Sequence, residues 1–311
     1  MKALVTGGAG FIGSNVVRLL LRNGFAVRVL DNLSTGYTRN LDGLTVELVQ
    51  GDVRDKGAVE SAVKGTEVVF HLAASIGNVK SLSNPQEDAE VNVIGTVNVL
   101  EAARKNLVRR VVYSSSAAIF GELLTMPIAE DHPQDPISPY GVSKLAGEKY
   151  VLCFGKLYGM TCVCLRYFNV YGVNQRYDAY GNVIPIFANR LLSGKPLTIF
   201  GDGEQTRDFV NVKDVAMANF LAATRAGKSG TYNVGSGESI TINQLARYIQ
   251  EAGGVRAAVE HAPPRKGEVR HCRADITKLR TELGYVPDPD IQAGLREYLR
   301  WFKQDIERSP A

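Results

Sequence analysis

Residues 2–14 read KALVTGGAGFIGS and combine a short apolar run, a glycine-rich turn and the start of an amphipathic stretch. The apolar run is typical of a strand, and FIGSNVVRLLLRNG places apolar residues three and four positions apart, which predicts a helix with one buried stripe. Gly7, Gly10 and Gly13 permit a tight turn whose N–H groups approach a pyrophosphate at the positive end of the helix dipole. A glycine-rich turn alone is weak evidence, because many strand-to-helix junctions use one. Its place between an apolar strand and an amphipathic helix strengthens the prediction of a dinucleotide site.

The alternation of strand and helix continues through the first half of the chain. Strand-like runs, nearly continuous in valine, isoleucine and leucine, occupy residues 2–7, 26–31, 45–52, 67–74, 109–116 and 161–170. Such runs are typical of parallel strands that crossover helices cover on both faces. We therefore predict an α/β fold with a doubly wound parallel (Rossmann) sheet.

After about residue 170 the pattern changes to turn formers, followed by helices with fewer strands. This change predicts a smaller α/β lobe that shares a cleft with the sheet. Residues 1–169 are expected to form the dinucleotide-binding domain, to which residues 205–234 return. Residues 170–204 and 235–311 are expected to form the substrate-binding lobe.

The composition is that of an ordinary globular protein, with 45% hydrophobic and 22% charged residues among 311. No apolar run approaches the length of a bilayer span, and the N-terminus enters a strand pattern without the features of a secretory signal. The net charge of +4 comes from scattered basic residues. We therefore expect a soluble, cytoplasmic protein that binds neither nucleic acid nor membrane.

The cysteines are too few and too irregularly spaced for a disulfide framework. We expect all four to be buried free thiols in a reducing compartment: Cys153, Cys162, Cys164 and Cys272. The four histidines add no set with metal-ligand spacing, so no metal site is predicted.

The second strand ends at Asp31, where a carboxylate can accept hydrogen bonds from both hydroxyls of an adenosine ribose. A 2′-phosphate would meet a like charge there, which favours NAD over NADP, although Arg39 leaves the alternative open. Asp52 and Val53 end the third strand, where either an adenine pocket or a helix-capping aspartate would fit. After the fourth strand, the small Ala73 and Ala74 suit the close passage of a dinucleotide.

Tyr140 and Lys144 stand four residues apart in SPYGVSKLAGE and would share one face of a helix. A lysine ammonium, together with the positive charge of a nicotinamide, would lower the pKa of the tyrosine and make its hydroxyl a usable base. Ser116 ends the fifth strand and would point into the same cleft. A packed tyrosine beside a solvated lysine is the alternative, but the preceding dinucleotide turn and serine-rich strand end favour catalysis.

Motifs along nearly the whole chain resemble one family. They are the glycine turn, DNLSTG (31–36), HLAA (71–74), SSSAAIFG (114–121), PYGVSK (139–144), LRYFNVYG (165–172), GDGEQTRDFVNVKDV (201–215) and YNVGSG (232–237). Together they are similar to the extended short-chain dehydrogenase/reductases, most of all to the nucleotide-sugar 4-epimerases of the UDP-glucose and UDP-N-acetylglucosamine type.

The resemblance implies NAD-dependent C4 epimerisation of a UDP-hexose. Tyr140 would take the proton from the sugar O4 while the C4 hydride passes to a tightly bound NAD, and the hydride would return to the other face of a 4-keto sugar. Lys144 would bind the nicotinamide ribose, and Ser116 would share the hydrogen bond to O4. The implied cofactor site comprises Gly7, Gly10, Phe11, Ile12, Gly13, Asp31, Asn32, Asp52, Val53, Leu72, Ala73, Ala74, Asn92, Ser114, Ser115, Tyr140, Lys144 and Tyr167.

The resemblance also implies a substrate site. Arg207 and Arg265 match residues that hold the diphosphate, Phe200 matches part of a uracil pocket, and Glu268 matches the residue that takes the uridine ribose. A surface salt bridge would explain Arg265 and Glu268 equally well. The full implied set is Ser116, Tyr140, Asn169, Asn182, Val183, Thr198, Phe200, Arg207, Arg265, Glu268 and Cys272.

Cys272 stands where relatives restricted to unacetylated sugars carry a tyrosine, and the smaller side chain leaves room for a 2-acetamido group. We therefore expect UDP-GlcNAc and UDP-GalNAc as substrates, with or without UDP-Glc and UDP-Gal. Ile76 replaces a lysine that some glucose enzymes place after the fourth strand, so sugar contacts there do not carry over.

Three other functions are alternatives to epimerisation of a neutral sugar. A dehydratase would need an acid and a base beside Ser116, where Ala117 and Ala118 stand. UDP-glucuronate 4-epimerisation stays open because Arg176 or Arg190 could hold a carboxylate. A non-catalytic NAD sensor is disfavoured by the intact reaction centre. The resemblance implies a homodimer through helices near residues 88–105 and 138–158.

Overall fold

The computed structural model describes residues 1–177, 181–264 and 269–308. Its centre is a seven-stranded sheet in the order β11-β6-β5-β4-β1-β2-β3, in which all neighbouring strands are parallel. The strands are β1 (Lys2–Thr6), β2 (Ala26–Asp31), β3 (Glu47–Gln50), β4 (Val68–His71), β5 (Arg110–Ser116), β6 (Thr161–Tyr167) and β11 (Gly230–Val234). The predicted α/β fold with a doubly wound parallel sheet is confirmed.

Helices cover both faces of this sheet, so successive strand residues enter two different cores. In β1, Ala3 and Val5 pack on the side of α1 (Phe11–Arg22) and α8 (Val212–Arg225), whereas Leu4 packs on the opposite side. That second side is covered by α2 (Lys56–Val63), α5 (Gly95–Lys105) and α6 (Pro139–Tyr158). Burial on both faces explains the nearly continuous apolar runs of these strands.

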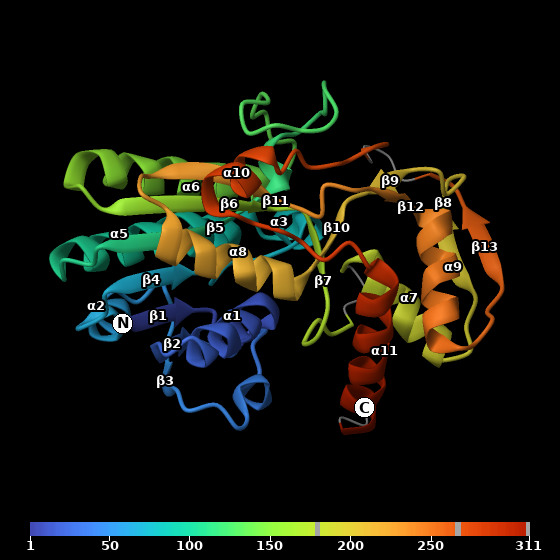
Figure 1. Ribbon diagram of the computed structural model, residues 1–311, viewed down its shortest axis with the longest axis horizontal. Helices are drawn as coiled ribbons and strands as arrows, with labels where there is room; N and C mark the ends of the chain where they lie inside the picture. Colours follow the sequence, from blue (N-terminus) through green and yellow to red (C-terminus); the bar gives the residue numbers. More distant parts are fainter. Residues whose placement is uncertain (178–180, 265–268, 309–311) are drawn as a thin grey trace.

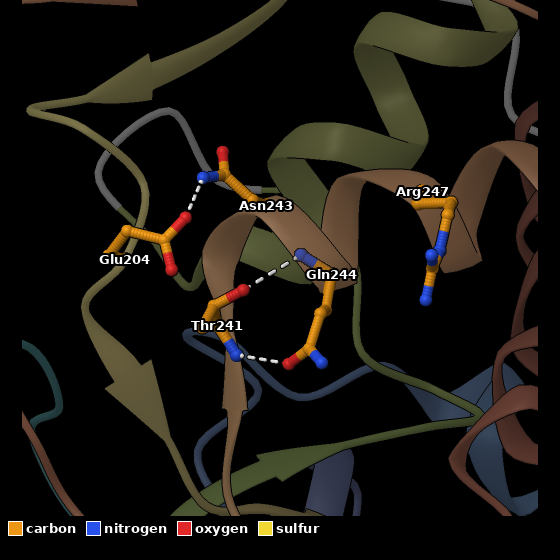
Figure 2. A pocket seen from close by; sticks show the side chains of 5 residues that line it. All are labelled: Glu204, Thr241, Asn243, Gln244 and Arg247. Carbon is orange, nitrogen blue, oxygen red and sulfur yellow. Dashed lines mark hydrogen bonds between the residues drawn. The ribbon is translucent and has the colours of Figure 1, made fainter.

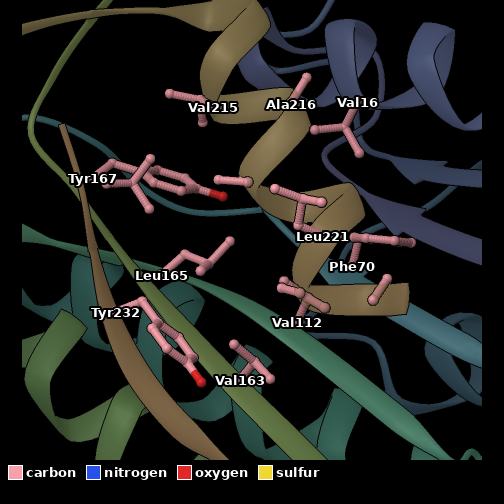
Figure 3. Packing of buried hydrophobic residues seen from close by; sticks show 14 of the residues in the cluster. Val16, Phe70, Val112, Val163, Leu165, Tyr167, Val215, Ala216, Leu221 and Tyr232 are labelled. Atoms are coloured by element: carbon pink, nitrogen blue, oxygen red, sulfur yellow. The ribbon is translucent and has the colours of Figure 1, made fainter. Parts of the chain in front are cut away.

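Figure 3 shows the core on the α1 and α8 side. Val16 of α1 and Leu221 of α8 approach Phe70 of β4 and Val112 of β5. Tyr232 of β11 belongs to the same cluster. Within residues 205–234, the strand β11 and the helix α8 thus pack with the central sheet.

A second group of elements lies beside the sheet (Figure 1). Its helices and strands are α7 (Val183–Leu192), β8 (Leu197–Phe200), α9 (Ile242–Gly253), β13 (Val259–Ala262) and α11 (Ile291–Arg308). They enclose a separate apolar cluster that includes Phe187, Leu245 and Leu295. Short strand pairs join the two groups: β7 (Asn169–Tyr171) with β10 (Phe209–Asn211), and β9 (Thr206–Arg207) with β12 (Ile240–Thr241).

The packing departs from the predicted boundaries in one segment. The helix α10 (Thr277–Leu283) contacts β11 and α8, and Leu279 and Tyr285 belong to the core beneath the sheet. Residues near 274–285 thus pack with the first unit, although residues 235–311 are expected in the second. The apolar spacing of α10 predicts a buried stripe, but only the tertiary contacts reveal which core receives it.

The cysteines differ partly from the expectation. Cys162 and Cys164 are buried and Cys272 is half-buried, but Cys153 is exposed on α6, which corrects the prediction for that residue. All four are free thiols. Over the described ranges, no helix combines the length and apolar character needed to cross a bilayer, and no cluster of acidic, histidine and cysteine side chains has the makings of a metal site.

Candidate active site

The glycine turn joins β1 to α1 at the carboxyl edge of the sheet. Gly7 has a positive φ of 69°, and a Cβ atom there would lie 2.8 Å from the Ala73 nitrogen. A Cβ atom on Gly13 would overlap the Gly7 carbonyl oxygen. Gly10 caps α1 without a side-chain hydrogen bond, so the unpaired N–H groups of the first helical turn stay open to a ligand. The turn therefore fits the pyrophosphate of a dinucleotide.

Gly13→Ala tests this packing. Because the added methyl group would overlap backbone atoms of the turn, we expect the free energy of unfolding to fall by about 1–3 kcal/mol and the affinity for NAD to fall with it. Gly57→Ala is the matched control, since Gly57 also lies in the first turn of a helix but has room for a Cβ atom. Urea unfolding and NAD titration measure both variants, and equal behaviour of the two would contradict the packing argument.

Asp31 ends β2 beside this turn. One carboxylate oxygen accepts a hydrogen bond from the Ala9 nitrogen and the other from the Leu33 nitrogen, each at 2.9 Å. Burial raises the pKa of Asp31, and these two hydrogen bonds oppose the rise. A carboxylate has further lone pairs for ribose hydroxyls, so the residue fits its predicted role. Arg39, which left NADP open, forms an ion pair with Asp305 at 3.6 Å.

Asp52 lies between two polar neighbours at the end of β3. Its carboxylate forms an ion pair with Arg54 at 2.7 Å and accepts a hydrogen bond from Asn32 at 2.8 Å, and the first of these contacts lowers its pKa. The alternative that Asp52 caps a helix is wrong, because the side chain of Asp55 caps α2. Val53 is buried in the core next to α2.

Asn92 holds the loop that follows β4. Its side-chain oxygen accepts from the Ser75 nitrogen, and its nitrogen donates to the Ser75 oxygen, both at 2.9 Å. It lies in a π-helical turn (Glu90–Ile94) between α4 (Pro85–Ala89) and α5. The predicted cofactor residue thus fixes Ser75, while Thr6 accepts hydrogen bonds from the Leu72 and Ala73 nitrogens.

The three candidate catalytic side chains come from β5 and α6. Ser138 caps α6 by accepting from the Gly141 nitrogen at 3.1 Å, and Pro139 occupies its first turn, so SPYG begins the helix as the sequence suggests. Tyr140 and Lys144 then lie one helical turn apart. Ser116 ends β5, and its hydroxyl accepts from the Ala118 nitrogen at 3.2 Å.

The electrostatics of this group differ from the expectation. Burial raises the pKa of Tyr140, the Ser116 hydroxyl opposes the rise, and the Asp88 carboxylate adds to it. Burial also lowers the pKa of Lys144 to about 8. The Lys144 ammonium lies 4.5 Å from the centre of the Tyr113 ring. The Ser116 hydroxyl is thus the group of this chain that opposes the rise in the Tyr140 pKa.

The side chains of two predicted cofactor residues form hydrogen bonds to helices that flank the sheet. The Ser115 hydroxyl donates to Glu148 at 2.7 Å beneath α6, because successive strand residues face opposite sides of the sheet. The Tyr167 hydroxyl pairs with Asn219 of α8, and burial raises its pKa. Ser114, one residue before Ser115 on β5, is also buried. Ser115 and Tyr167 thus hold helices on the two faces of the sheet.

On the substrate side, Arg207 and Cys272 come together. Burial raises the pKa of the Cys272 thiol to about 12, and the nearby Arg207 charge opposes that rise. Asp208, next to Arg207, is fully buried. Its carboxylate accepts hydrogen bonds from the Ser236, Gly237 and Ala274 nitrogens, and it thereby joins the loop after β11 to the segment that follows Cys272. The sequence reading missed Asp208, although its place between Arg207 and an apolar strand was a usable signal.

The remaining predicted substrate residues are spread over the second group of elements. The Asn169 side chain, on β7, donates to the main-chain carbonyl oxygen of Asp208 at 3.2 Å. Thr198 and Phe200 are half-buried positions of β8 that alternate with its buried residues. Asn182 is an exposed cap of α7, and Val183 is the first residue of that helix. Arg265 and Glu268 lie outside the described residues.

A surface cavity of about 270 Å³ lies at the start of α9, and none of the predicted site residues lines it (Figure 2). Its polar groups bond largely to one another: Thr241 and Gln244 form a capping box, and Asn243 donates to Glu204 at 2.6 Å. These contacts stabilise the helix end.

The structure also contains a buried hydrogen-bonded chain that was not predicted from the sequence. Thr6, His71 and Thr96 link the ends of β1 and β4 to α5, with His71 Nδ1 2.7 Å from the Thr6 hydroxyl and Nε2 3.0 Å from the Thr96 hydroxyl. Burial lowers the pKa of His71 to about 3, so the ring is neutral. A histidine inside the apolar run VVFHLAA indicates a buried ring that needs hydrogen-bond partners, and this was the feature that could have revealed the chain.

The model of the NAD dependent epimerase/dehydratase family matches residues 3–235. The chain belongs to this family. The resemblance to the extended short-chain dehydrogenase/reductases is therefore confirmed, and this family member is an NAD-dependent enzyme.

Named relatives of this epimerase/dehydratase family member match over almost their whole lengths. The UDP-glucose 4-epimerase of Mycolicibacterium smegmatis is 40% identical over 97% of this chain and 99% of its own. The Thermus thermophilus UDP-glucose 4-epimerase in complex with NAD superposes with a TM-score of 0.89 at 41% identity, covering 97% of this chain and 99% of its own. The UDP-N-acetylglucosamine 4-epimerase of Methanobrevibacter ruminantium, in complex with UDP-N-acetylmuramic acid, gives 0.94 at 36% identity, covering 98% of each chain.

Proposed function

We propose that this enzyme catalyses C4 epimerisation of a UDP-hexose. The observation that carries the proposal is the grouping of Ser116, Tyr140 and Lys144 at the carboxyl edge of a sheet whose glycine turn fits a dinucleotide. The similarity to UDP-sugar 4-epimerases over nearly the full chain supports the same activity.

The chain's own residues have distinct roles in this proposal. Bound NAD supplies a reversible hydride acceptor. Tyr140 removes the proton from the sugar O4 and later returns it, while Ser116 orients that hydroxyl and opposes the rise in the tyrosine pKa. Lys144 supplies a positive charge beside the nicotinamide ribose. Ala117 and Ala118 follow Ser116 and offer no acid or base for dehydration.

A 2-acetamido sugar is the proposed substrate class. Cys272 lies beside Arg207 and is smaller than a tyrosine, which leaves space near the sugar. The uronate alternative loses support, because the Arg176 guanidinium donates two hydrogen bonds of 3.0 Å to Asp305 and Arg190 donates to the Pro196 oxygen. Both cations are thereby engaged with this chain's own groups.

The decisive experiment incubates purified enzyme separately with UDP-Glc, UDP-GlcNAc and UDP-GlcA, without added NAD, and resolves the C4 epimers. We expect UDP-GalNAc from UDP-GlcNAc, with or without UDP-Gal from UDP-Glc. Turnover of UDP-Glc alone would contradict the proposed substrate class. Absence of any epimer, after the enzyme is shown to hold NAD, would contradict the proposed reaction.

Cys272→Tyr tests the size argument within one protein. We expect kcat/KM for UDP-GlcNAc to fall at least about tenfold, because a clash of this kind is worth roughly 1–3 kcal/mol, while turnover of any unacetylated sugar persists. Cys272→Ser keeps the small volume and serves as the control. Parallel loss with both sugars, or an unchanged rate with UDP-GlcNAc, would show that the side chain does not limit the acetamido group.

The homodimer also belongs to the proposal. Exposed apolar side chains near the expected helices support it, namely Ile94, Tyr150, Leu157 and Tyr158. A cytoplasmic location is proposed on the same footing, with four free thiols in its support.

A further inference from the structure

A buried carboxylate that the proposed chemistry does not use lies beneath the reaction centre. Asp88 is 1% exposed and belongs to α4. Within the part of the chain that the structure describes, it has no ion-pair partner within 4 Å. A buried charge without a compensating group is costly, so the surroundings of Asp88 must supply hydrogen bonds and a cation.

The hydrogen bonds come from α6 and the π-helical turn. The Ser143 hydroxyl donates to one carboxylate oxygen at 2.5 Å, and the Asn92 amide donates to the other at 3.1 Å. Ser143 lies between Tyr140 and Lys144 on α6, and Asn92 clamps the loop after β4. Asp88 therefore links the helix that carries the reaction centre to the loop beside the glycine turn.

Among the described residues Asp88 and Lys144 form no ion pair, but the Asp88 carboxylate favours the charged form of Lys144 through space. Asp88 is the strongest of the groups that stabilise the Lys144 ammonium against burial, ahead of Cys164 on β6 and Glu148 on α6. Glu148 already has an ion pair with Arg166 at 2.7 Å. Two aromatic groups also lie near the ammonium. The Tyr113 ring of β5 lies beneath it, and its positive charge helps to lower the pKa of His71 on β4.

We propose that Asp88 is a positioning residue that fixes α6 against the loop after β4 and supplies the negative charge that keeps Lys144 an ammonium ion. The inference rests on the proposed function, in which that ammonium serves the reaction. It adds a residue that acts through Lys144 and Ser143.

The direction of the expected effect follows from the charges. A carboxylate facing an ammonium favours its protonated form, so removing the negative charge lowers the pKa of Lys144 further below its present value of about 8. We expect a downward shift of about one unit. At neutral pH the variant would then carry a larger fraction of neutral lysine.

The test titrates Lys144 directly by NMR of protein labelled with ¹³C at the lysine Cε, using Lys144→Met to identify the signal. Asp88→Asn keeps the shape and removes the charge, and Asp88→Ala is a second neutral variant. Ser143→Ala is the matched control, since it deletes a hydrogen bond to Asp88 and leaves the carboxylate. The expected result is a shift to lower pH in both neutral variants and a titration close to wild type in the control.

Every other outcome overturns the inference. A Lys144 signal that titrates as in wild type in a folded neutral variant would show that Asp88 does not hold the charge. An equal shift in Ser143→Ala would assign the effect to packing, and failure of both neutral variants to fold would assign Asp88 to the fold alone. Because the titration needs no turnover, it gives its answer even if no sugar is epimerised.

Discussion

Replacing Tyr140 with phenylalanine is expected to lower kcat for the UDP-sugar by roughly 10²–10⁴-fold, the contribution of a positioned acid or base. The variant loses the hydroxyl that moves the O4 proton but keeps the ring at the start of α6. NAD should remain bound, because the glycine turn and Asp31 are untouched. Epimer formation under saturating UDP-sugar and the NAD released on denaturation measure the two effects.

Tyr150→Phe is the matched control for this change. Tyr150 lies on the same helix and is 44% exposed, so removal of its hydroxyl should leave both kcat and bound NAD unchanged. If Tyr140→Phe retains more than about a tenth of wild-type kcat, general acid–base catalysis by this tyrosine is refuted. Loss of NAD in the same variant would instead give Tyr140 a part in holding the cofactor.

Replacing Arg166 with methionine should lower the free energy of unfolding by about 3–5 kcal/mol, because it leaves a buried carboxylate uncompensated. Arg166 and Glu148 are 2% and 0% exposed, and their ion pair joins β6 to α6. Arg166 also donates to the main-chain carbonyl oxygen of Glu130 at 2.7 Å, and the Ser115 hydroxyl donates to the Glu148 carboxylate. Urea unfolding followed by circular dichroism measures the loss.

Two further variants separate burial from charge. Arg104→Met removes a partner of Glu101 from a pair that is 38% exposed on both sides, and it should leave the free energy of unfolding nearly unchanged because solvent screens the pair. The double change Arg166→Met with Glu148→Leu removes both buried charges and should recover much of the loss. A double variant as unstable as Arg166→Met would show that shape, not charge, limits stability here.

The reaction centre could be predicted because its residues lie in short sequence motifs that mark a strand end and a helix start. Tyr140 and Lys144 share a helix, and SPYG marks where that helix begins. Ser116 follows an apolar run that the structure shows as β5. In a parallel sheet the carboxyl ends of all strands lie at one edge, so strand ends and the glycine turn are brought together once the strands are recognised.

The partners of buried polar side chains were not predicted. Ser115 and Asn92 are predicted cofactor residues, and the structure adds that their side chains bond to Glu148 and to the loop at Ser75. Arg166 inside TCVCLRYF was a visible anomaly, since a cation in an apolar run requires a buried partner. Nothing in the sequence identifies that partner as Glu148, eighteen residues earlier on a different element.

Periodicity and glycine placement are properties of neighbouring residues, and they were enough to establish the order of strands and helices, the doubly wound sheet and the position of the phosphate turn. Hydrogen-bond partners, burial and charge balance depend on residues far apart in the chain. The tertiary structure alone therefore decided that Arg166 pairs with Glu148, that Asn92 and Ser143 donate to Asp88, and that α10 joins the core beneath the sheet. Each is settled by which groups exclude water together, and that is a property of the packed molecule.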